Sequence, residues 1–274
     1  MSRSENLIEE ADQVVEGELL QTMDVRGYLA FVTVAGGRVP YSALARVARE
    51  VGLGREYVPH LRDLKGSFSA ARHQLDGIPL PTLTELEGWE GPVRQHLWCR
   101  PLRMAREYQV SIESEGRMNG RSHREATPIM RLTYEEPEDF NPSAWVRNYE
   151  DTCWETNNPA HPDTEIIRDC LHMEPYWENE YYDIELMQDI FSRVLAEFEQ
   201  TATCIDSTAL RQQFRSVLTH HLGAVSFGAG KGVWFVPNTP NMDALDILVN
   251  SSELFREFQR RHDSDNAEEL TTYI

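Results

Sequence analysis

The sequence predicts an α+β protein, in which a helical first part leads into a central antiparallel β unit and then a C-terminal module of helices and short strands. Three observations favour this class. Apolar residues recur at helical spacing near both ends of the chain. Polar and apolar residues alternate in the middle, as they do in half-buried strands. Asn119-Gly120, a dipeptide typical of tight hairpins, separates two of those alternating stretches.

The clearest helix covers residues 183–200, where apolar residues from Ile184 to Phe198 form one stripe and Asp183 can cap the first turn. In the last helix, Thr239 is a good N-cap and Pro240 suits the first turn. All the helices expected are at residues 5–23, about 43–51, about 55–64, 67–75, 163–171, 183–200, 208–222 and 241–260.

Two strands are expected over 109–113 and 129–134, with a third near 96–104. Near the C-terminus, 224–227 and 232–236 look like two short strands joined by a glycine-rich turn. The apolar run 28–35 is compatible with either a strand or a buried helix.

The chain is expected to divide where its composition changes. Residues rich in glycine and proline predict a linker, and acidic residues with Trp, Tyr, Pro and Asn predict an irregular connector. The expected parts are a helical part with a helix-turn-helix-like segment over 1–76, a linker over 77–94, the β unit over 95–134, the acidic connector over 135–182, C-terminal helices with a β-wing over 183–262 and a tail over 263–274.

Composition excludes several classes of protein. With 41% apolar residues the chain can build a core. It contains no run of eighteen apolar residues, so no membrane span is predicted. The four cysteines form no Cys-x-x-Cys pair and no secretory signal is visible, so reduced thiols in a cytoplasm are expected. The formal net charge of −19, with only two lysines, is typical of a halophilic protein, although a GC-rich genome also favours arginine.

The charge is unevenly distributed. Residues 135–206 hold 19 acids and 3 arginines. By contrast, residues 41–74 and 94–125 each carry a net charge of +3. The acidic average therefore hides two mildly basic stretches that could meet a polyanion.

A window that starts at Leu44 resembles the helix-turn-helix pattern. Ala48 is small where two helices would cross, and Gly52 suits the turn between them. The resemblance implies that Arg55, His60 and Arg62 lie on or near an exposed second helix, the element that enters the major groove in DNA readers. The same helical core also serves as a protein-docking module, so DNA contact is one of two interpretations.

Residues 207–237 follow the order helix, strand, turn, strand, as in the last elements of a winged helix. Arg211, Gln212 and Arg215 would then point outward, and Lys231 would lie at the wing tip. Such side chains suit phosphates and base edges. The alternative is a solvated helix beside a hairpin that covers a core.

The segment Gly230-Lys231-Gly232-Val233-Trp234-Phe235-Val236-Pro237 resembles the Gly-Gly-Val-Tyr-Phe-Val-Pro signature of an uncharacterised family found among phages, plasmids and haloarchaea. An earlier Phe68-x-x-Ala71 followed by Arg72 is similar to that family's Phe-Arg-Arg-Ala segment. The resemblance implies a setting on a mobile element.

No catalytic or cofactor motif is present, so we expect a non-enzymatic protein without a cofactor or a metal. A zinc site is a weaker alternative, because N and S ligands are scattered rather than paired. Its ligands would be Cys153, His161, Cys170 and His172.

Two hypotheses about function follow. The first is a DNA-associated accessory or regulatory protein of a virus, plasmid or haloarchaeon, with double-stranded DNA as partner and no membrane. The second is a structural or assembly protein that binds itself or another protein through aromatic side chains, which interfaces favour. Those aromatic residues are Trp145, Trp154, Tyr176, Trp177, Tyr181 and Tyr182.

Overall fold

The computed structural model describes residues 27–31, 36–103, 106–156, 165–176, 184–226, 233–238 and 244–270. The chain forms two compact units. Unit 1 is Met1–Gly37, Val47–Val58 and Ser207–Ile274, and unit 2 is Arg38–Arg46 and Pro59–Asp206. The division falls within α2 (Tyr41–Glu50). Since each unit combines helices with antiparallel strands, the predicted α+β class is confirmed.

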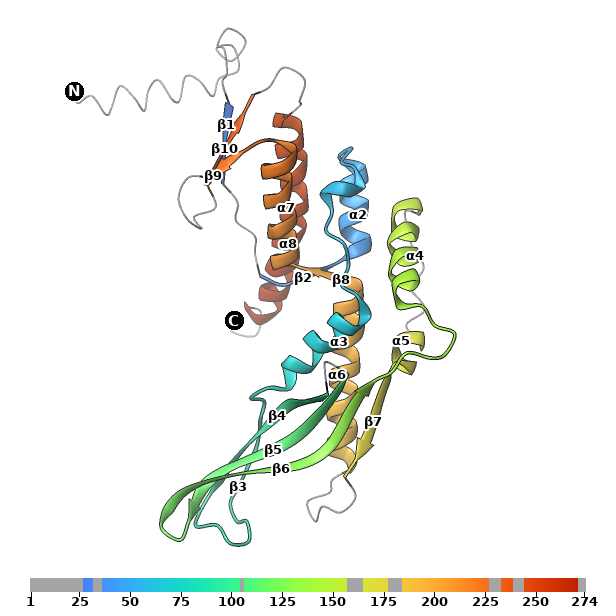
Figure 1. The fold of residues 1–274 in the computed structure, drawn as a ribbon. Helices are drawn as coiled ribbons and strands as arrows, with labels where there is room; N and C mark the ends of the chain where they lie inside the picture. The colour runs from blue at the N-terminus through green and yellow to red at the C-terminus, as the bar shows by residue number, and fades with distance from the viewer. Residues whose placement is uncertain are drawn as a thin grey trace, which may run out of the picture. The chain divides into compact units, whose positions relative to one another are not determined.

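Unit 2 is built on a five-stranded sheet of order β3-β4-β5-β6-β7, with every neighbouring pair antiparallel (Figure 1). The strands are β3 (Pro79–Leu83), β4 (Val93–Arg103), β5 (Glu107–Met118), β6 (Arg121–Tyr134) and β7 (Leu171–Pro175). Asn119 and Gly120 join β5 to β6 with φ of 52° and 71°. Both angles lie in the left-handed region that a type I′ hairpin requires, so the predicted turn and the antiparallel unit are confirmed.

Two helices of unit 2, α3 (Leu64–Arg72) and α6 (Ile184–Thr203), pack with the sheet in one core. Because side chains alternate across a strand, Val110 and Leu132 face these helices. We call this side of the sheet the helix side and the opposite one the open side. The stripe predicted for 183–200 is the buried face of α6, so that helix is confirmed.

The predicted linker over 77–94 differs from the structure, because Pro79–Leu83 forms the edge strand β3. Pro79 and Pro81 lack the N–H that a central strand must donate, but an edge strand tolerates them. The remaining loop folds back along the sheet: Glu90 N donates to Arg117 O at 2.7 Å.

The acidic segment over 135–182 is also more regular than predicted. It contains α4 (Pro142–Glu155), α5 (Glu165–Asp169) and β7. Asn141 caps α4 by accepting a hydrogen bond from Ala144 N at 3.0 Å, and the buried Tyr149 and Cys153 lie one turn apart on one face. The short helix expected over 163–171 corresponds to α5. Outside the sheet, β2 (Arg38–Pro40) pairs with β8 (Cys204–Asp206).

Unit 1 contains a three-stranded sheet of order β1-β10-β9, made of β1 (Gly27–Phe31), β10 (Val233–Pro237) and β9 (Val225–Ser226). The apolar run near residue 28 is therefore a strand over its described part. Helices α7 (Ser207–Ser216) and α8 (Ala244–Leu270) supply the rest of the core, and a π-turn over Val217–His221 continues α7. Helix α8 runs into the segment that was predicted to be a tail.

The second helix of the predicted helix-turn-helix, over 55–64, is not formed. A single 3-10 turn, η1 (Arg55–Tyr57), is followed by extended backbone with Val58 at φ −97° and ψ 133°. Pro59 explains the difference, because proline disfavours helical geometry in the residue before it and donates no hydrogen bond. Helix α2 and the turn at Gly52 (φ 75°) match the prediction. The helix predicted over 5–23 lies outside the described residues.

Candidate nucleic-acid interface

The arginines predicted on α7 are not equivalent in the structure. Arg211 turns back along its own helix, where Nε donates to Ser207 O at 3.0 Å and Nη2 donates to Ser207 Oγ at 3.1 Å. Gln212 and Arg215 are exposed to solvent. Lys231 lies outside the described residues. On α7 itself, two of the three predicted contacts are thus free to meet a ligand.

The other predicted contacts lie in two different units. Arg55 begins η1 in unit 1, whereas His60 and Arg62 belong to unit 2. His60 Nδ1 is 3.1 Å from Glu150 Oε2, and Arg62 forms an ion pair with Asp206. The structure therefore does not gather these residues on one exposed helix. Glu150 is 5% exposed and also accepts from Leu61 N at 2.8 Å, so His60 and its neighbour anchor a structural carboxylate.

The open side of the unit 2 sheet carries a larger set of cations. Cross-strand register places Arg94, Glu115 and Arg124 in one row. Other rows add further charged side chains at the alternate positions of β4 to β7. The arginines on this side are Arg94, Arg100, Arg103, Arg117, Arg124 and Arg131, and the glutamates beside them are Glu107, Glu113, Glu115 and Glu174. Six guanidinium groups thus face four carboxylates.

Some of these charges neutralise each other. Arg124 Nη2 is 2.5 Å from Glu113 Oε2, and Arg124 Nε is 3.1 Å from Glu115 Oε1. The hydrogen bond with Glu113 raises the pKa of Arg124 further above its usual value. Arg131 forms an ion pair with Glu174 in the same way. Glu113, which is only 6% exposed, needs such partners because burying an unpaired carboxylate is costly.

Two further cations, Arg94 and Arg117, keep their charge available, whereas Arg100 Nη2 lies 3.9 Å from Glu113 Oε1 and Arg103 Nη1 lies 4.0 Å from Glu107 Oε1. In the described part of the chain, Arg94 forms no ion pair, and Arg117 makes only a long hydrogen bond of 3.4 Å to Gly120 O. Both side chains are exposed. Residues 116–124, at the end of the β5–β6 hairpin, contain three arginines, one histidine and no acid. Arg94 and Arg117, the open-side arginines without an ion pair among the described residues, both lie toward the hairpin end.

Two ring-bearing side chains lie in the middle of the open side. His96 is the cross-strand partner of Glu113, and Trp98 is that of Ser111. Both rings are half-buried, so one part of each remains accessible. Rings of this kind can stack on nucleic-acid bases while arginines contact the backbone.

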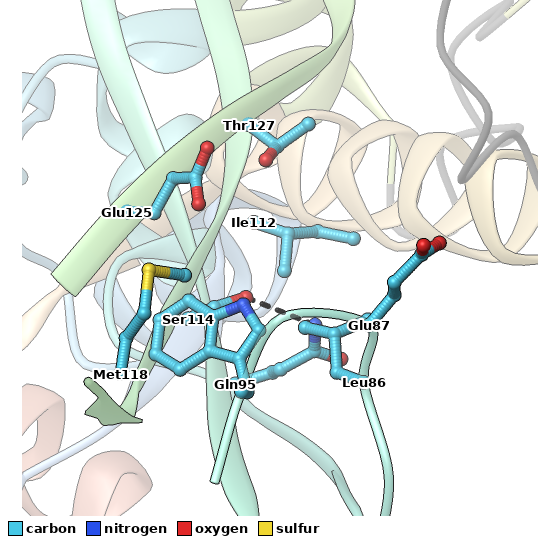
Figure 2. A pocket seen from close by; sticks show the side chains of 9 residues that line it. Leu86, Glu87, Gln95, Ile112, Ser114, Met118, Glu125 and Thr127 are labelled. Atoms are coloured by element: carbon cyan, nitrogen blue, oxygen red, sulfur yellow. Dashed lines mark hydrogen bonds between the residues drawn. The ribbon is translucent and has the colours of Figure 1, made fainter. Parts of the chain in front are cut away.

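A small cavity lies on the helix side of the same sheet, beyond the two helices. Its volume is about 120 Å³, and nine residues line it. Figure 2 shows the carboxylates of Glu87 and Glu125 on either side of Ile112, and a hydrogen bond of 3.0 Å from Gln95 Nε2 to Ser114 Oγ below them. The charged residues in the lining of this cavity are thus both acidic, in contrast to the open side.

Metal and thiol chemistry find no support in the described residues. No group of three His, Cys, Asp or Glu side chains there could hold a metal ion. Of the four ligands of the zinc alternative, His161 lies outside the described residues. Burial raises the pKa of Cys99 and of Cys170 to about 12, so neither thiol is an activated nucleophile.

The sequence shows an excess of basic over acidic residues across 94–125, but it does not indicate that these residues form a site. The signal that could have located the site is the period of two. Arg94, Arg100, Arg117 and Arg124 fall on one side of their strands once the register is known. Without the register the four positions cannot be assigned to a common face.

These features define a class: an α+β protein of two compact units with an arginine-rich open sheet face. Residues 25–268 match the model of a family of unknown function, DUF6744, and the chain belongs to that family. Neither curated proteins nor solved structures contain a match. In the part of the chain that the structure describes, no helix is long and apolar enough to cross a membrane.

Proposed function

We propose that the chain is a non-enzymatic, DNA-associated accessory protein, which contacts DNA with the open side of the unit 2 sheet. The observation that carries the proposal is the excess of arginine on that side, where six arginines accompany four glutamates. Arginine binds phosphate with paired N–H donors, and neutralising phosphates releases counterions. The setting we propose is the cytoplasm of a haloarchaeon or another host of viruses and plasmids.

The geometry supports both backbone contact and base contact. The hairpin end is a two-stranded ribbon, which is the kind of element that a major groove admits. Arg94 and Arg117 lie near this end, where their charges can reach phosphates on either side of the groove. Trp98 and His96 would instead stack on unpaired bases, so comparing a duplex with its single strand tests which contact dominates.

The net charge of −19 opposes any contact with DNA. Such repulsion acts over about 10 Å at 0.1 M salt and weakens in concentrated salt, whereas contacts within the site persist. The proposal therefore predicts local binding by one face, with the acidic remainder limiting indiscriminate association.

Removing two free cations should weaken DNA binding and reduce its salt dependence. With Arg94→Ala plus Arg117→Ala, the slope of log K against log salt should fall by about 2, because each phosphate contact contributes roughly 0.9. Fluorescence anisotropy between about 50 and 200 mM salt, with a labelled duplex and its single strand, measures the slope.

The matched control is Arg211→Ala plus Arg215→Ala, which removes the same charge from α7. It should leave the slope unchanged. If the α7 pair abolishes binding while the sheet pair does not, the winged-helix interpretation replaces ours. If wild-type protein binds neither DNA form at about 50 mM salt, the DNA proposal is abandoned.

A second candidate function, assembly through protein contacts, is favoured by a different observation in unit 1. Leu29, Phe235 and Val225 occupy one cross-strand row of the three-stranded sheet. Leu29 is 61% exposed and Val225 is 62% exposed. An exposed row of large apolar side chains marks a surface that another protein can cover. Two of the aromatic residues predicted for this role serve otherwise: Trp145 packs against the unit 2 core, and Trp154 Nε1 donates to Tyr41 Oη at 2.9 Å. Trp177, Tyr181 and Tyr182 lie outside the described residues.

Leu29→Lys plus Val225→Lys should abolish any association that this row mediates, because two charges would have to be desolvated in the contact. Light scattering after gel filtration measures the mass across a concentration series. Leu102→Lys is the control, since Leu102 is 48% exposed but lies in unit 2. An unchanged mass in the double variant would rule out this surface.

A further inference from the structure

The small cavity on the helix side of the sheet is bounded by the loop between β3 and β4, which is fixed to the β5–β6 hairpin by several contacts. The indole of Trp89 lies against Gly116, where an added Cβ would be 2.9 Å from Trp89 Cε3. The same ring lies 5.3 Å from the ring of His123. Both carboxylate oxygens of Glu90 accept from Gly120 N at 3.1 Å. These contacts fix the loop against the hairpin, so the lining of the cavity is preorganised for a ligand.

The lining selects the chemistry of what can enter. Trp89, Met118 and Ile112 present an aromatic and two aliphatic surfaces, while Glu87 and Glu125 present carboxylates. Two carboxylates repel phosphate and attract a cation, and an aromatic face adds a cation–π contact. Guanidinium combines both features, since it is planar, stacks on aromatic rings and pairs with carboxylates.

The size of the cavity limits the ligand to a single group. At about 120 Å³ it is smaller than the roughly 150 Å³ cavity that takes up benzene, and far below the volume of sites for larger ligands. One side chain of a polymer fits this space, whereas a nucleotide does not. The cavity therefore points to an arginine presented by a protein.

The same end of the sheet presents such an arginine. Arg121 is the cross-strand partner of Met118, so it lies on the helix side with the cavity, and it is exposed. Within one copy, Arg121 and Glu125 are four residues apart on one strand, or roughly 13 Å. Among the described residues, the Arg121 side chain forms no ion pair with a carboxylate of its own cavity and is exposed. A surface that carries both the Arg121 side chain and a cavity that fits a guanidinium is self-complementary, as a twofold contact requires.

We propose that two copies of the chain associate through their β5–β6 hairpin ends, each cavity taking the Arg121 guanidinium of the other copy. The guanidinium stacks on Trp89 and pairs with Glu87 and Glu125. Arg94 and Arg117 lie on the open side and stay uncovered, so this inference does not rest on DNA binding.

Charge reversal across the contact tests the proposal. Sedimentation velocity should show wild-type protein in a monomer–dimer equilibrium within concentrations up to about 1 mM. Arg121→Glu and Glu125→Arg should each weaken association at least about tenfold, because each places like charges together. Mixing the two variants should restore association, since both contacts of the mixed dimer pair opposite charges: one is the wild-type pair and the other is its reverse.

The controls separate this contact from other effects. Arg117→Glu changes the same charge on the same hairpin but faces the open side, and it should leave the dimer intact. Circular dichroism checks that each variant is folded, and Arg121→Gln with Glu125→Gln gives a milder pair if reversal unfolds the hairpin. N-acetyl-arginine methylamide should compete with the dimer, while the neutral citrulline analogue should not.

Three results would overturn the proposal: wild-type protein that stays monomeric, a mixture that associates no better than its components, or a dimer that Arg117→Glu disrupts equally. If the arginine probe binds a monomeric wild-type protein, the cavity belongs to an arginine of a different partner. Loss of DNA binding in the Arg94 and Arg117 variants, with an intact dimer, would leave this inference standing.

Discussion

Replacing Phe68 with alanine is expected to lower the free energy of unfolding by about 3–5 kcal/mol. The ring is fully buried at the centre of the unit 2 core. Its centroid lies 5.4 Å from the ring of Tyr108, 5.7 Å from that of Tyr134 and 5.9 Å from that of Phe198. Truncation loses the transfer free energy of the ring, its aromatic contacts and the packing around the cavity left behind.

Urea unfolding followed by near-ultraviolet circular dichroism measures this loss. Phe191→Ala is the matched control, because Phe191 lies on α6 beside the same core but is only partly buried. It should cost clearly less. Equal losses in the two variants would mean that the aromatic cluster around residue 68 is not the centre of the core.

Alkaline pH is the second condition with a large expected effect on stability. Burial raises the pKa of the Cys99 and Cys170 thiols from 9.0 to about 12. Above pH 9 the unfolded chain therefore releases thiol protons that the folded chain retains. Since the folded state then binds more protons, stability must fall as pH rises from 9 toward 12. At pH 10 each thiol should cost about 1.4 kcal/mol, or roughly 3 kcal/mol for the pair.

Two buried phenols act in the same direction. Burial raises the pKa of Tyr134 and of Tyr149 above the usual value of 10.0, so each adds to the loss of stability at still higher pH. The phenols begin to contribute only where an unfolded tyrosine ionises. Between pH 9 and 10 the thiols therefore dominate the slope.

Urea midpoints under reducing conditions at pH 8 and pH 10 measure the difference. Cys99→Ala plus Cys170→Ala should flatten the pH dependence by roughly 3 kcal/mol, whatever the variant costs at pH 8. Cys204→Ala is the control, because Cys204 is partly exposed. A wild-type stability that does not change between the two values would contradict the burial of both thiols.

The central β unit could be predicted because its signals are local. Alternation over 109–113 and 129–134, with Asn119-Gly120 between, defines a hairpin whose register follows from its turn. The α6 helix was equally clear, since its apolar stripe needs only one partner surface. In each case neighbouring residues contain the information, and distant contacts only reinforce it.

Most of the elements that were not predicted correctly from the sequence depend on partners far away in the chain. The predicted linker became the edge strand β3 because β4 offered it hydrogen bonds, and the irregular connector gained β7 because β6 did the same. Helix 55–64 failed for a local reason, Pro59, whose effect on Val58 outweighed the spacing of apolar residues. The candidate interface was missed because alternate positions on four strands share a face only when the register is known.

By itself, the sequence determined the α+β class, the main hairpin and its turn, the long helix α6 and the local excess of arginine over 94–125. Only the tertiary structure decided that β1 pairs with β10, that Arg62 and Arg124 are neutralised by carboxylates, and that arginines of separate strands share the open side. The physical reason is the distance along the chain over which each kind of interaction acts. Backbone geometry and turns depend on neighbouring residues, whereas strand order and ion pairing depend on residues that are distant in the chain.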